Sequence, residues 1–153
     1  MTNEQAIRSI LEDWATSVRR RDIDGVMAAH ADEVLMFDVV GPLSMRGADK
    51  YRASWVDLFF PWHGGTGKFE LKNLEVTAGA SVGFATALID CAGTEAGRPV
   101  AFTVRLTVGL KKRDGAWLVT HEHHSEPLPF DRDAIGRAHN DWSLPANNME
   151  SRS

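Results

Sequence analysis

The segment THEHHSEP, residues 120–127, places three histidines and two glutamates in a stretch that otherwise has the pattern of a strand. Because side chains alternate between the two faces of a strand, His121 and His123 should share one face, while Glu122 and His124 share the other. An imidazole close to a carboxylate can hold or transfer a proton near neutral pH. The alternation leaves open which of the two faces looks into the protein.

A second candidate for proton chemistry is Asp38, which follows the apolar run VLMF and precedes two valines. A carboxylate in a strand of such neighbours must be hydrogen-bonded, protonated or available to a ligand, because an unpaired buried charge costs too much free energy. Two roles stay open: a base in a functional site, and a partner for the turn at GPL. His30 is a third candidate, expected on the last turn of a short helix, where it could simply interact with the helix dipole.

Several other chemistries lack their characteristic residues. His121 and His123 have no companion ligands at a recognisable spacing, so we expect no metal site. No G-x-S-x-G elbow, P-loop or dinucleotide fingerprint is present, and the single cysteine, Cys91, has no nucleophile motif around it. We therefore expect no cofactor. Arg105 and Thr107 could instead join the two histidines in a polar sheet surface that contacts a second subunit.

Composition narrows the partners further. The net charge is -4, and the only basic run, Arg19–Arg21, is followed at once by acids, so we expect no nucleic-acid binding. No stretch approaches about 18 apolar residues, and the N-terminus lacks the pattern of a signal peptide. With a single cysteine, the chain cannot form an intramolecular disulfide. We expect a cytoplasmic protein that does not bind membranes.

Periodicity predicts helices first and strands afterwards. Apolar residues at helical spacing indicate a helix from Asn3 to Val18, capped at Thr2 or Asn3, and a shorter one over residues 22–31. A strand over 33–40 and a third helix over 47–62, ended by Pro61, follow. The remaining runs have strand character, with an aspartate-glycine hairpin turn before the last: 68–78, 81–93, 98–113 and 116–125.

The length of 153 residues suits one domain. Helices followed by consecutive hairpins predict an α+β fold, in which a curved, mainly antiparallel sheet wraps around a helical layer. We expect the domain to span residues 1–126 and the proline-containing tail, residues 127–153, to form an arm or to fray.

The order of elements around HADEVLMFDVVGPLSMRGADKYRASW, residues 30–55, resembles the nuclear transport factor two-like superfamily. Within it, the chain is similar to SnoaL-like and ketosteroid-isomerase-like proteins from Asn3 to Glu126. The spacing W-x-x-x-H-x-H-x-S from Trp117 to Ser125 also resembles the last strand of the calmodulin-dependent kinase two association domain. This resemblance implies a cone-shaped half-barrel with three N-terminal helices in the concave face of the sheet, and a homodimer.

The resemblance also implies a site. Asp38 matches the general base of the isomerase, and His124 matches a pocket position, so these two are the expected catalytic residues. The expected pocket wall comprises Trp14, His30, Met36, Trp55, Phe59, Leu106, Thr120 and Glu122. The two oxyanion donors of the isomerase fall at Trp14 and Leu106, and leucine donates no hydrogen bond, so we do not expect steroid isomerisation.

These features predict a cofactor-independent acid/base enzyme of the isomerase, dehydratase or cyclase type, acting on a small apolar carbonyl or hydroxyl compound. The alternatives are a non-catalytic module for small-ligand binding or dimerisation, and a structural dimer with a filled pocket. The fold alone does not choose among them.

Overall fold

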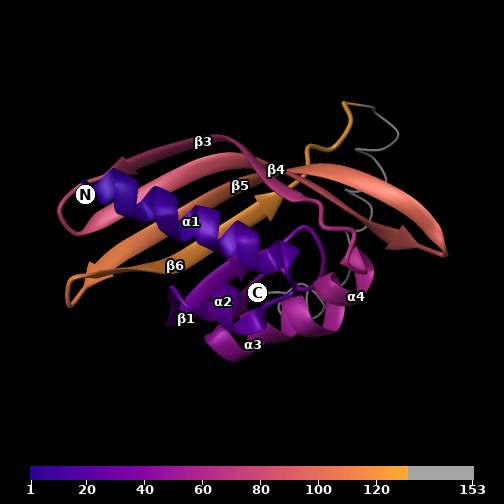
Figure 1. Cartoon of the computed structure of the whole chain (residues 1–153), viewed down its shortest axis with the longest axis horizontal. Coiled ribbons are helices and arrows are strands. Elements are labelled where there is room, and N and C mark those ends of the chain that lie inside the picture. Colours follow the sequence, from indigo (N-terminus) through magenta and orange to yellow (C-terminus); the bar gives the residue numbers. More distant parts are fainter. Residues whose placement is uncertain (131–153) are drawn as a thin grey trace, which may run out of the picture.

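The structure is a computed structural model, and it describes residues 1–130. Helices occupy the first half of the chain and long strands the second half (Figure 1). The elements in chain order are α1 (Asn3–Arg19), α2 (Ile23–Met27), β1 (His30–Phe37), β2 (Met45–Arg46), α3 (Ala48–Ala53), the π-helix η1 (Ser54–Phe59), α4 (Phe60–His63), β3 (Phe69–Ala78), β4 (Val82–Glu95), β5 (Arg98–Arg113) and β6 (Ala116–Ser125).

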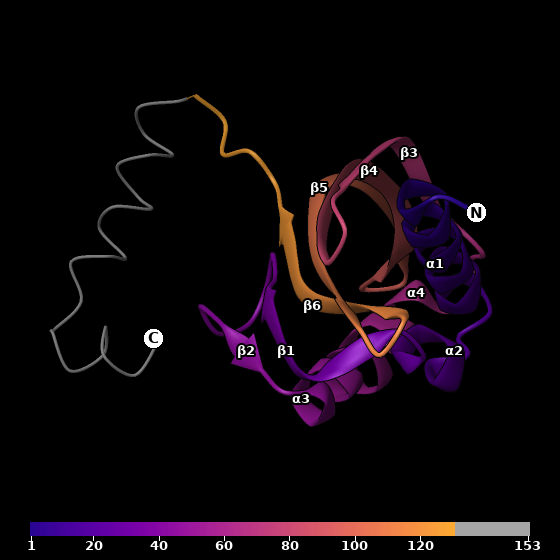
Figure 2. The ribbon, with the colours of Figure 1, turned by 90° about the vertical axis from the view of Figure 1, so that its left-hand side faces the viewer.

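The strands form one sheet in the order β2-β1-β6-β5-β4-β3. β1 pairs with β6 in parallel, and every other pairing is antiparallel. Figure 2 shows the sheet curving around α1, with the other helices near the β1 side. The predicted α+β half-barrel is therefore confirmed.

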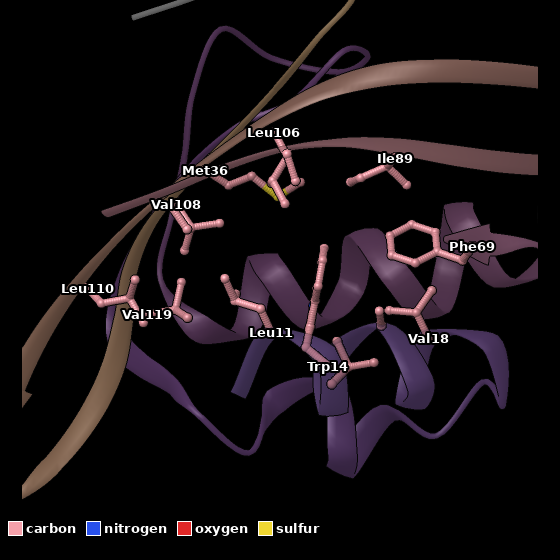
Figure 3. Packing of buried hydrophobic residues seen from close by; sticks show 14 of the residues in the cluster. Leu11, Trp14, Val18, Met36, Phe69, Ile89, Leu106, Val108, Leu110 and Val119 are labelled. Carbon is pink, nitrogen blue, oxygen red and sulfur yellow. The ribbon is translucent and has the colours of Figure 1, made fainter. Parts of the chain in front are cut away.

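Helix α1 fills the concave face of the sheet. Thr2 caps it, because its hydroxyl accepts the Gln5 backbone N–H while the Gln5 side chain accepts that of Thr2. Its apolar residues recur every three or four positions, so they share one face, which is buried. Figure 3 shows these side chains pointing toward residues of the strands, and the labelled members of this core are Leu11, Trp14, Val18, Met36, Phe69, Ile89, Leu106, Val108, Leu110 and Val119.

The second helix is shorter than its sequence pattern predicts, and this changes the place of His30. α2 ends at Met27, and His30 is the first residue of β1. The Val119 backbone N–H donates to the Ala29 carbonyl at 2.7 Å, and His30 pairs with Val119. The prediction that His30 ends a helix is wrong, because sheet pairing outweighs a weak local helical preference here.

The third helical stretch is one continuous run with a π-helical middle. Ser54–Phe59 forms η1, in which the chain is wound more widely than in an α-helix. The sequence pattern predicts that Pro61 ends this run, but α4 continues to His63. Pro61 lies directly after the π-helical turn, and its missing N–H leaves out one hydrogen bond of the run without ending it.

A β-bulge in β6 decides which side chains face inward. Gly109 pairs with His121 but Leu110 pairs with Val119, so Thr120 is the extra residue. The bulge reverses the alternation, and Trp117 and Val119 lie on the buried face together with Glu122 and His124. Unbroken alternation along residues 117–125 would put Trp117 and Val119 on the same face as His121 and His123, and this expectation is wrong because of the bulge.

The hairpin turn before β6 forms as predicted. Asp114 and Gly115 both have positive φ, 50° and 80°, as this two-residue turn requires. Most of the predicted C-terminal arm, residues 131–153, lies outside the described residues, so the boundary at residue 126 stays a prediction. Within residues 1–130, no helix is long and apolar enough to cross a membrane.

Candidate functional site

A cavity of about 390 Å³ lies between the η1–α4 helical run and the concave side of the sheet. Such a volume suits a small organic molecule. Its wall is mainly aromatic, with five rings contributed by η1, α4, β3 and β5: Trp55, Phe59, Trp62, Phe69 and Phe102. Asp38 and His124 line the same cavity.

Asp38 follows directly after β1 rather than lying within it, because β1 ends at Phe37. Its Oδ1 accepts the Val39 backbone N–H at 2.7 Å, so the carboxylate does help to shape the turn. Burial raises the pKa of Asp38 above its usual value, and the positive charge of His124 and the Val39 hydrogen bond only partly offset this.

His124 reaches the cavity from β6. Its Nε2 donates to Oε2 of Glu122 across 3.0 Å, and its ring lies edge-on to Trp14. Although burial opposes the charged form, the Glu122 carboxylate raises the pKa of His124 above its usual value. With Nε2 engaged by Glu122, Nδ1 is the ring nitrogen left to meet a ligand.

Glu122 is 1% exposed and lies behind His124. Three side chains donate to its carboxylate: His124 to Oε2, and to Oε1 both His30, at 2.5 Å, and the Tyr51 hydroxyl, at 2.8 Å. Burial alone would raise the pKa of Glu122, but the charges and hydrogen bonds of His30 and His124 hold it well below the usual range. Glu122 is therefore a buried carboxylate whose two oxygens are both hydrogen-bonded, and one of these bonds holds the His124 ring.

Tyr51 connects this carboxylate to α1. Its hydroxyl donates to Glu122 and accepts the Trp14 indole N–H at 3.1 Å. Burial and the nearby Glu122 raise the pKa of Tyr51 well above its usual value, so the phenol stays protonated. The indole N–H of Trp14 is thus used within the protein and is not available to a ligand oxygen, the role that the resemblance to the isomerase implies for this position.

The predicted site residues divide into three groups. Met36, Trp55 and Phe59 line the cavity with Asp38 and His124. Behind the wall lie Trp14, His30, Glu122 and Leu106; the last is 2% exposed and pairs with His124. The bulge removes Thr120 from this face, and its hydroxyl donates to the Gly109 carbonyl. The fold therefore brings together all of the expected residues except Thr120, but only some of them touch the cavity.

Several residues of the site are missed by sequence reasoning. Tyr51 lies within the expected helix over 47–62 but is not among the expected site residues, although a buried tyrosine hydroxyl needs a hydrogen-bond partner, and this requirement is a usable signal. The cavity residues Trp62, Phe69 and Phe102 carry no such signal, because aromatic residues in strands and helices are ordinary core residues.

Cys91 and the outer histidines complete the list of candidates. Burial raises the pKa of the Cys91 thiol to about 11, so the thiol, which lines the cavity, stays protonated and weakly nucleophilic. Nδ1 of His121 donates to the Leu35 carbonyl at 2.7 Å, and Phe37 packs edge-on against the rings of both His121 and His123. Within residues 1–130, no three His, Cys, Asp or Glu side chains are grouped as metal ligands. That the protein binds no metal stays a prediction.

The half-barrel with an internal cavity defines the class of fold, and the sequence defines the family. A family model described as the SnoaL-like domain matches residues 7–129. The chain belongs to this SnoaL-like family, within the nuclear transport factor two-like superfamily.

Solved structures agree with this assignment. The chain is 32% identical to a nuclear transport factor two-like protein of unknown function from Pseudomonas putida KT2440, over 84% of this chain and 89% of that chain, with a TM-score of 0.71. A ketosteroid isomerase-like protein from Erwinia carotovora atroseptica is 20% identical over 81% and 97% of the two chains, with a TM-score of 0.69.

The predicted resemblance to the kinase association domain is also supported at the level of fold. A protein from Xanthomonas campestris, assigned to the calcium/calmodulin-dependent protein kinase II association domains, is 16% identical over 82% of this chain and 87% of that chain, with a TM-score of 0.67. No match is found among curated proteins.

Proposed function

We propose that the protein is a cofactor-independent acid/base enzyme that acts on a small, mostly apolar carbonyl or hydroxyl compound. The observation that carries the proposal is the placement of Asp38 and His124 on the wall of one aromatic cavity. A base and an acid that face the same bound molecule are what isomerisation, dehydration and ring closure require.

Asp38 acts as the base. Burial raises its pKa, which increases its affinity for a proton taken from a C–H group next to a carbonyl, or from a hydroxyl group. The Val39 N–H fixes one carboxylate oxygen, which leaves the other to accept the proton.

His124 acts as the acid or as an orienting donor. Glu122 stabilises its imidazolium form and, by accepting from Nε2, directs Nδ1–H to the ligand. An imidazolium at this position stabilises the negative charge that develops on a carbonyl oxygen when Asp38 removes a proton. Glu122 is thus a positioning residue, as are His30 and Tyr51, which hold its carboxylate.

The test is Asp38→Asn, which keeps the side chain's shape and removes its charge. We expect turnover to fall by a factor of about a thousand or more, with little change in melting temperature or ligand affinity. Glu75→Gln, an exposed change of the same charge, serves as the control. Full activity in Asp38→Asn would contradict the proposal.

The same test separates the rival function, a non-catalytic module for small-ligand binding. The cavity itself suits that role as well, since an aromatic wall binds ligands without any chemistry. In a binding module, Asp38→Asn changes affinity and there is no turnover to lose.

A further inference from the structure

The charges around the cavity point to a class of ligand. Besides Asp38, two carboxylates line it near the surface: Glu95 at the end of β4 and Glu126 after β6, both exposed. Among the described residues, no lysine or arginine lines the cavity. The positive charge of His124 is already offset by Glu122 directly behind it.

Specific contacts hold the aromatic wall next to Glu95 in place. Trp62 donates its indole N–H to Oε1 of Glu95 at 3.2 Å, and its ring stacks on Phe102 with centroids 5.8 Å apart. Gly93 makes room for this ring, because a Cβ at that position would lie 2.4 Å from it. Aromatic rings together with a carboxylate form a favourable environment for an organic cation.

We propose that the natural ligand carries a cationic amine on an aromatic or polycyclic body, with the amine at the mouth of the cavity, where Glu95 and Glu126 are exposed, and the apolar body deeper in the cavity. The inference rests on the proposed function, in that both place the ligand in this cavity. An anionic ligand would enter a region lined by three carboxylates without a compensating lysine or arginine among the described residues. A carboxylate ligand is therefore selected against.

The carboxylates around the cavity also affect the proposed proton transfer to Asp38. When Asp38 takes a proton from a neutral substrate, the negative charge moves onto the substrate; the His124 imidazolium stabilises it there, but Glu95 and Glu126 oppose it. A substrate that carries its own positive charge offsets this, since the intermediate after deprotonation is then neutral overall. The acidic mouth of the cavity and the base Asp38 are compatible with each other for a cationic substrate.

Three probes that share one body and differ in charge test the inference: naphthylmethylamine, naphthylmethanol and naphthoate. Calorimetric titration of the full chain should give the order of affinity amine, alcohol, carboxylate. Added salt should weaken the binding of the amine and leave that of the alcohol unchanged, because salt screens exposed charges.

Variants then locate the effect. Glu95→Gln and Glu126→Gln should each lower the affinity for the amine by about two- to fivefold and leave the affinity for the alcohol unchanged within error. Glu75→Gln should change neither affinity. Equal or tighter binding of naphthoate would overturn the inference, as would amine affinity that is unchanged in both variants, or no binding by any probe. None of these measurements needs turnover, so their failure is distinguishable from the failure of the acid/base function, which the Asp38→Asn assay decides.

Discussion

Glu122 and His124 lie two residues apart on the concave face of β6, and Nε2 of His124 donates to Oε2 of Glu122 across 3.0 Å. The histidine lines the cavity, whereas the glutamate is buried behind it. The pair thus places a charged hydrogen bond between the protein core and the ligand space. The cost of burying these charges is offset only while all the partners of Glu122 are present.

Replacing Glu122 with glutamine should therefore destabilise the fold and alter His124. An amide cannot accept from His30, Tyr51 and His124 as a carboxylate does, so we expect a loss of about 3 kcal/mol in the free energy of unfolding. Urea denaturation measures this loss. In an NMR titration, the pKa of His124 should fall toward or below its usual value of 6.5, since Glu122 is what raises it. An unchanged His124 titration would contradict the assignment.

The same substitution should change how stability depends on pH. The pKa of His124 is raised by folding, so its contribution is fully present below about pH 6.5 and is lost as the pH rises through its folded value. The pKa of Glu122 is lowered by folding, so its contribution is present above about pH 4.5 and is lost in acid. Glu122→Gln should flatten both limbs, whereas Glu75→Gln should leave the profile unchanged.

Tyr51→Phe removes one donor to Glu122 and the acceptor of the Trp14 indole N–H. We expect a loss of about 2 kcal/mol, because both former partners are buried. Trp14→Phe and the double variant complete a double-mutant cycle. The sum of the losses in unfolding free energy of the two single variants should exceed the loss of the double variant. Strict additivity in denaturation experiments would show that the two residues do not act together.

His63 should make the protein sensitive to acid. It is fully buried and stacks on Phe59, and neither ring nitrogen has a hydrogen-bond partner among the described residues. Burial lowers its pKa, so the stability that depends on the neutral ring is present above about pH 6.5 and is lost as the pH falls through the folded value.

The substitution His63→Phe keeps a stacked ring and removes the titration. We expect a gain of up to about 1 kcal/mol near neutral pH, and a smaller fall in stability between about pH 7 and about pH 5. Denaturation midpoints at the two pH values measure both effects. Glu75→Gln, at an exposed position, is the control and should not reduce the fall. An equally steep fall in His63→Phe would contradict the prediction.

A homodimer through the convex face of the sheet is expected from the exposed Arg105, Thr107 and His123. A substitution in a two-fold interface acts twice, so Thr107→Arg should favour the monomer, while Glu4→Arg on α1 should not. Light scattering measures the mass, and a wild-type value near 16.9 kDa at micromolar concentration would contradict the dimer.

The sequence by itself determines the helices and strands that have strong periodic patterns. The amphipathic pattern of α1, its Thr2 cap and the Asp114–Gly115 turn are local properties, because each depends on residues within a few positions along the chain. The order of these elements carries the resemblance that predicts the fold, and it is this resemblance, rather than the strand pattern alone, that selects Asp38 and His124 as catalytic candidates and Glu122 as a wall residue.

Only the tertiary structure decides which of these residues face the cavity. The bulge at Thr120 depends on how β6 pairs with β5, and the place of His30 depends on pairing with Val119. The hydrogen bond from Tyr51 to Glu122 joins residues 71 positions apart. Such contacts carry no local signal, because they arise from the register of strands and the packing of helices on them. The roles of His124 at the cavity and Glu122 behind it follow from that register.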